Sequence, residues 1–131
     1  MIQSEKSQSF YGSLAHLFYS VASVDKAVRT DEIQTLKNIV KEKWLDADDY
    51  EDAFGTDTAF QIEIVFDWLL DAEPSSESCF KVFEEYKKDN EKQFSQKMKS
   101  LIWETADSIA ASFSGKNKSE IIVLAKLKQL L

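Results

Sequence analysis

Residues 21–36 read VASVDKAVRTDEIQTL and overlay without a gap on residues 109–124, which read IAASFSGKNKSEIIVL. Four positions are identical in the two stretches: Ala22/Ala110, Glu32/Glu120, Ile33/Ile121 and Leu36/Leu124. The stretches also share an order of parts, namely an apolar helix, a short polar loop and a second helix with an acidic residue in its first turn. A repeated supersecondary unit determines how a chain packs. The overlay therefore predicts a fold with two related helix–loop–helix units.

Helical periodicity continues through the rest of the chain. Apolar residues recur every three or four positions, which places them on one face of a helix. Three glycines and one proline leave room for few sharp turns. We therefore predict one all-α domain over residues 1–131, with residues 1–8 as a flexible start and a compact bundle of about six helices. The helices are expected over residues 9–24, from the N-cap Thr30 to Trp44, over residues 58–71, from a cap at Ser75 or Ser76, over residues 92–113 and from about Ser119.

The segment 58–71 is the most apolar part of the chain. Its acidic residues Glu63, Asp67 and Asp71 recur every four positions and form one narrow strip, while apolar residues cover most of the remaining surface. A helix that is apolar on several sides is usually buried on several sides. We therefore predict that this helix is the centre of the core, with the two related units packed around it.

Charge is unevenly distributed along the chain, whose net charge is −7. Residues 46–91 carry 15 acidic side chains and three lysines, a net charge of −12, whereas residues 92–131 carry three acids and seven lysines, a net charge of +4. The acidic middle would repel phosphates, so we expect no nucleic acid partner. Two explanations of the acidic strip stay open. It is either the outlet of its helix to water, or the contact for lysines of a partner or for Lys126 and Lys128 of this chain.

The loop of the first repeated unit begins Ala22-Ser23-Val24-Asp25-Lys26, and its second helix opens with Glu32. This arrangement resembles the TerB-like (tellurite-resistance) helical domain family, in which each half carries a helix, a loop beginning Ala-x-x-Asp-Gly and a second helix opened by Glu. The first unit departs from the pattern at Lys26, and the second unit has neither the loop aspartate nor the glycine. The resemblance implies a small all-α fold, a link to stress responses, metal-ion binding through the acidic loops and assembly with other proteins.

Asp25, Asp31 and Glu32 are the metal-ligand candidates that the resemblance suggests. A hard divalent cation takes six or more oxygen ligands, whereas these residues supply three carboxylates next to Lys26 and Arg29, which repel a cation. Acids in the first turn of a helix also stabilise it by about 0.3–1 kcal/mol each through the helix dipole. We therefore expect Asp31 and Glu32 to stabilise the helix start, and we expect no cofactor. A divalent-cation-responsive domain remains the alternative function.

His16 and Cys79 are the only histidine and the only cysteine, too few for a zinc site within the chain. His16 lies off the apolar face of its helix, which indicates a surface position. Cys79 lies near Glu77 and Glu84, which would raise the pKa of its thiol, so we expect an unreactive core cysteine. Because no catalytic constellation is apparent, we expect no enzymatic activity and no small-molecule substrate.

No segment approaches the run of roughly 18 apolar residues that spans a membrane. The first residues also lack the pattern of a signal peptide, so a cytoplasmic location is expected. Together these observations favour a non-enzymatic helical interaction module that acts on a protein partner or on a second copy of itself. The residues expected to make that contact are Glu63, Asp67 and Asp71.

Overall fold

A computed structural model describes residues 2–24, 30–44, 61–112 and 118–131 of the chain. Six α-helices occupy these four ranges and no strand occurs in them, which confirms the predicted all-α fold. The helices are α1 (Ile2–Ser23), α2 (Thr30–Ile39), α4 (Gln61–Ala72), α5 (Ser76–Asp89), α6 (Gln96–Ala111) and α7 (Lys118–Leu130). A π-helical turn, η1 (Val40–Trp44), continues α2, and a 3-10 turn, η2 (Glu91–Gln93), lies between α5 and α6.

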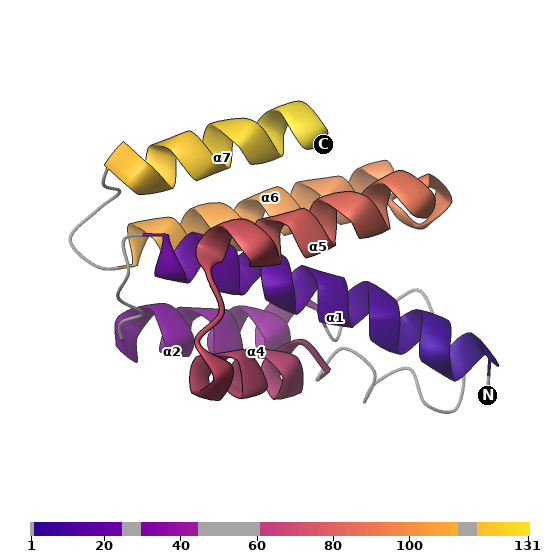
Figure 1. The fold of residues 1–131 in the computed structure, drawn as a ribbon, viewed down its shortest axis with the longest axis horizontal. Coiled ribbons are helices and arrows are strands. Elements are labelled where there is room, and N and C mark those ends of the chain that lie inside the picture. The colour runs from indigo at the N-terminus through magenta and orange to yellow at the C-terminus, as the bar shows by residue number, and fades with distance from the viewer. Residues whose placement is uncertain (1, 25–29, 45–60, 113–117) are drawn as a thin grey trace.

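Helix α1 is the centre of the bundle. It contacts α4, α5, α6 and α7, and Figure 1 shows it between α4 on one side of the molecule and α7 on the other. Nine of its apolar side chains are buried: Phe10, Tyr11, Leu14, Ala15, Leu17, Phe18, Tyr19, Val21 and Ala22. At helical spacing these residues cover more than half of the helix circumference, and the buried Ser13 and Ser20 extend the buried part, while Gly12 and His16 are half-buried.

Two polar residues do not prevent this burial, because α1 satisfies their hydroxyls with its own backbone. The Ser13 hydroxyl donates a hydrogen bond to the Phe10 carbonyl (2.7 Å), and the Ser20 hydroxyl donates one to the Leu17 carbonyl (2.6 Å). Both serines are buried. A buried hydroxyl costs free energy mainly when it lacks a partner. Serines that bond back along their helix therefore extend the buried surface of α1 beyond its apolar residues.

Helix α4 packs against α1 on one side only. Ile62, Phe66 and Leu69 are buried, whereas Ile64 and Trp68 are 58% and 62% exposed. The prediction that this helix forms the centre of the core is therefore wrong. An apolar side chain increases the gain from burial, but a neighbouring element must be present to cover it, and the outer side of α4 remains exposed.

The internal repeat is visible in the helix boundaries. α1 ends at Ser23 and α6 ends at Ala111, while α2 begins at Thr30 and α7 begins at Lys118, so both pairs are separated by 88 residues. Three of the four identical pairs are buried in both units: Ala22/Ala110, Glu32/Glu120 and Leu36/Leu124. The first helices, α1 and α6, pack on each other, and each second helix contacts the first helix of the other unit, α2 on α6 and α7 on α1. The two units are thus interlocked.

Two helix starts differ from the prediction, and one is confirmed. α1 begins at Ile2, so residues 2–8 are helical where a flexible start was expected. α6 begins at Gln96 rather than at residue 92, because the Ser95 hydroxyl accepts a hydrogen bond from the Met98 amide (3.2 Å) and caps the helix there. The Ser75 hydroxyl caps α5 as predicted, accepting from the Ser78 amide (3.1 Å). Residues 45–60, which include the first residues of the helix predicted over 58–71, lie outside the described ranges, as do residues 113–117.

We expect Leu69→Ala to lower the free energy of unfolding by about 2–5 kcal/mol, because it removes a buried side chain from the α1–α4 contact. Trp68→Ala on the same helix should change it by no more than about 0.5 kcal/mol, because that side chain faces solvent. Urea unfolding of the two variants and the wild type measures both effects. Equal losses of stability in the two variants would contradict the orientation of α4.

Candidate interaction surface

The side of α4 that faces away from α1 carries four residues, Ile64, Asp67, Trp68 and Asp71, and all four are exposed. They are spaced i, i+3, i+4 and i+7, so they form one continuous face, named here the α4 face. Two large apolar side chains thus lie beside two carboxylates. Trp68 is the most exposed of the large apolar side chains in the described part of the chain.

Glu63 belongs to the predicted acidic strip but lies on a different side of α4, toward α2, where it is half-buried. Burial raises the pKa of the Glu63 carboxyl, Lys37 and Lys41 lower it, and Asp67 raises it further. The Lys37 ammonium also lies 3.7 Å from the Asp67 carboxylate, in an exposed ion pair. Two members of the strip therefore meet lysines, and the lysines come from α2 and η1.

The predicted contact of the strip with Lys126 and Lys128 is wrong, because both lysines lie on α7, across the bundle from α4 (Figure 1). The Lys128 ammonium lies 5.8 Å from the centre of the Trp103 ring on α6, a cation–π contact. Lys126 is exposed. Because the bundle separates the acidic α4 from these lysines, the two do not complement each other within one molecule.

Helix α7 has an exposed face of its own. Ile121 is 54% exposed and Ile122 49% exposed, and Lys118 and Ala125 lie on the same side of the helix. Lys126 and Lys128 lie at the two borders of this face. We call these six residues the α7 face: Lys118, Ile121, Ile122, Ala125, Lys126 and Lys128. Its composition mirrors that of the α4 face, with lysines in place of aspartates.

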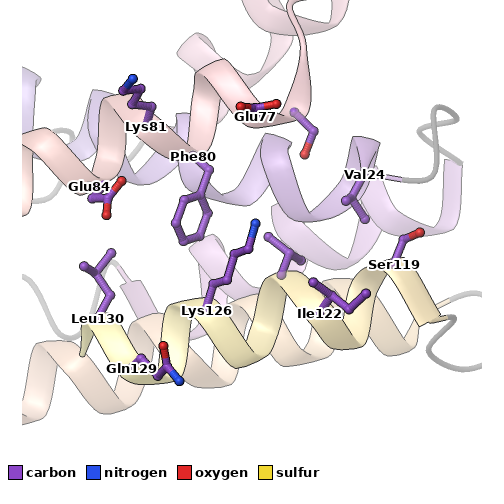
Figure 2. A pocket seen from close by; sticks show the side chains of 12 residues that line it. Val24, Glu77, Phe80, Lys81, Glu84, Ser119, Ile122, Lys126, Gln129 and Leu130 are labelled. Carbon is purple, nitrogen blue, oxygen red and sulfur yellow. The ribbon is translucent and has the colours of Figure 1, made fainter.

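A pocket of about 760 Å³ lies between α5 and α7, next to the end of α1 at Val24. Figure 2 shows Phe80 of α5 pointing toward α7 and Lys126 of α7 extending toward α5. Glu77 and Glu84 add carboxylates on the α5 side. The lining mixes both charges with apolar side chains, and it does not bring together a nucleophile and a base.

The metal-ligand candidates do not converge in the part of the chain that the structure describes. Asp31 is exposed, whereas the neighbouring Glu32 is 1% exposed, so the two carboxylates point to different sides of α2. Asp25 lies outside the described residues. Within those residues, no group of three or more histidine, cysteine, aspartate or glutamate side chains is arranged to hold a metal ion.

His16 and Cys79 are both less accessible than a reactive residue would be. His16 is half-buried rather than at the surface, and its Nδ1 lies 2.8 Å from the Gly12 carbonyl oxygen, to which it donates a hydrogen bond. Cys79 is buried as expected, and burial is the main cause that raises the pKa of its thiol, opposed by a hydrogen bond with Ser78. The acids expected to raise it are not the main cause.

Sequence reasoning missed Ile64 and Trp68 as surface residues. The prediction of a helix buried on several sides placed Trp68 in the core, because an apolar side chain does not reveal whether another element covers it. A usable signal was present: these two residues, with Asp67 and Asp71, form a single face at helical spacing. Aspartate is rarely buried, so a face on which apolar residues alternate with two aspartates indicates the surface.

Comparison with known proteins gives no match to this chain, whether with family models, curated proteins or solved structures. Among the described residues, no helix is long and apolar enough to cross a membrane. An assignment of function therefore rests on the geometry and charge of the α4 and α7 faces.

We expect Glu63→Gln to raise the free energy of unfolding at pH 7 by about 0.2–0.5 kcal/mol, the size of one like-charge pair at i, i+4. The raised pKa means that the folded state binds a proton at Glu63 more tightly than the unfolded state does. Protonation of Glu63 removes the free-energy cost of its charge in the folded state. The wild type therefore regains this stability as the pH falls through the raised pKa toward the ordinary value of 4.5. Urea unfolding of both proteins between pH 7 and pH 4 should show the difference shrink. A variant less stable than the wild type at pH 7 would show that attraction to Lys37 outweighs burial.

Proposed function

We propose that this chain is a non-enzymatic helical interaction module that binds a basic amphipathic helix of a protein partner through the α4 face. The observation that carries the proposal is the exposure of Trp68 and Ile64 beside the carboxylates of Asp67 and Asp71. Exposed tryptophan is costly to leave in water, and aromatic residues are enriched among the side chains that dominate binding energy in interfaces. A face of this kind fits a partner that covers it.

Charge identifies the kind of partner. α4 contains three acidic residues and no basic residue, so an approaching surface must supply positive charge to avoid repulsion. Apolar side chains are also required, because Ile64 and Trp68 gain free energy only when they are removed from water. A helix that carries lysines or arginines beside apolar residues meets both requirements, and helices of this kind dock into apolar surfaces at spacings of three and four residues.

The TerB-like resemblance is kept as part of this proposal, together with a role in a cytoplasmic stress response. Its structural support is the repeated helix–loop–helix layout with matching boundaries and the pair Glu32 and Glu120, both buried in the first turn of their helices. The alternative of a cation-responsive domain gains no support from Asp31 and Glu32, which point to different sides.

A synthetic amphipathic helix of leucine and lysine residues is the probe that tests the proposal. We expect it to bind the wild type in isothermal titration calorimetry, with an affinity that falls steeply as salt is added. The variant Ile64→Ala/Trp68→Ala should bind at least about tenfold more weakly, because it loses the apolar centre of the contact.

Two controls make this result specific. Val82→Ala, which shortens an exposed apolar side chain on α5, should bind the peptide like the wild type. A peptide with glutamate in place of every lysine should not bind, because it places carboxylates against Asp67 and Asp71. Equal affinity of the Ile64→Ala/Trp68→Ala variant and the wild type would exclude the α4 face as the binding site.

A further inference from the structure

We propose that the basic helix bound by the α4 face is the α7 face of a second copy of this chain, so that copies associate head to tail. This inference rests on the proposed function, because it assigns the partner of the same surface. Its basis is the complementarity of the two faces. One carries Asp67 and Asp71 beside Ile64 and Trp68. The other carries Lys118 beside Ile121 and Ile122, with Lys126 at the border toward α5 and Lys128 at the border over the Trp103 ring.

The two faces match in charge sign and in length. α4 has 12 residues and α7 has 13, which correspond to about 18 Å and 20 Å at a rise of 1.5 Å per residue. The acidic residue of α7, Glu120, is 3% exposed and lies on the buried side of the helix. The exposed side of α7 therefore presents lysines without a neighbouring carboxylate on the same helix.

One molecule cannot satisfy both faces by itself. α1 lies between α4 and α7, and Figure 1 shows the two helices on opposite sides of the bundle. The lysines that do reach the acidic strip, Lys37 and Lys41, lie beside Glu63 and Asp67 at the α2 border. The outward part of the α4 face, around Trp68 and Asp71, is thus left for a surface that comes from outside.

A contact between different faces of two copies is heterologous, so a dimer leaves an α4 face free at one end and an α7 face free at the other. Association then continues into a ring or an open chain rather than stopping at a dimer. Two single helices cover less surface than a stable interface of about 1,200–2,000 Å² requires. The assembly is therefore weak, dependent on concentration and sensitive to salt.

Analytical ultracentrifugation of the wild type and two charge-reversal variants tests the inference. The first variant, Asp67→Lys/Asp71→Lys, makes both faces basic, and the second, Lys118→Glu/Lys126→Glu, makes both faces acidic. We expect the wild type to associate at low salt and dissociate at high salt. Each variant alone should associate at least about tenfold more weakly, because its two faces repel each other. An equimolar mixture of the variants should associate again, since each then offers the opposite charge. Unchanged circular dichroism and melting midpoints show that the variants fold.

A wild type that stays monomeric at low salt and high concentration would overturn the inference, as would a Lys118→Glu/Lys126→Glu variant that associates like the wild type. Titration of the same proteins with the leucine–lysine peptide distinguishes failure of the self-association from failure of the proposed function. A monomeric wild type that binds the peptide at the α4 face keeps the proposed function and shows that the partner is a different protein.

Discussion

The structure depends on the burial of α1 over most of its circumference. Ser13 and Ser20 bond back to the carbonyls of Phe10 and Leu17, so these two buried hydroxyls are satisfied beside the apolar residues of the helix. Four other helices then pack directly on α1, and α2 is attached through α6. There the Trp44 indole nitrogen donates a hydrogen bond to the Thr105 hydroxyl (3.0 Å), inside the core.

A bundle arranged around one central helix leaves its outer helices covered on one side only. For α4 and α7 the uncovered side is partly apolar, and in each case the apolar residues lie beside charges of one sign. The two signs are opposite, and the thickness of the bundle keeps them apart. The fold thus places the acidic α4 face and the basic α7 face on opposite sides of the bundle, which is the physical basis of the proposed interaction.

Local features of the fold were predictable from the sequence, and the choice of the central helix was not. Helix periodicity, the Ser75 cap and the overlay of residues 21–36 on 109–124 depend on neighbours along the chain, and the structure agrees with them. The burial of α1 and the exposure of Trp68 depend on which helices pack together. The composition suggested α4 as the central helix, because α4 contains no serine and is more apolar than α1. A serine that bonds to its own helix counts as a polar residue in the sequence, yet its side chain is buried in the structure. Of the candidate site, the sequence identified the acidic residues Asp67 and Asp71, whereas the neighbouring Trp68 was predicted to lie in the core.

Native-state hydrogen exchange tests the central position of α1 most directly. If α1 is the helix on which the others depend, the amides of residues 10–22 exchange only through global unfolding, and their protection equals the full free energy of unfolding. The amides of α4 and α7 exchange sooner, through local opening of helices that are covered on one side. Protection that is highest in α4, with α1 exchanging before it, would contradict this account.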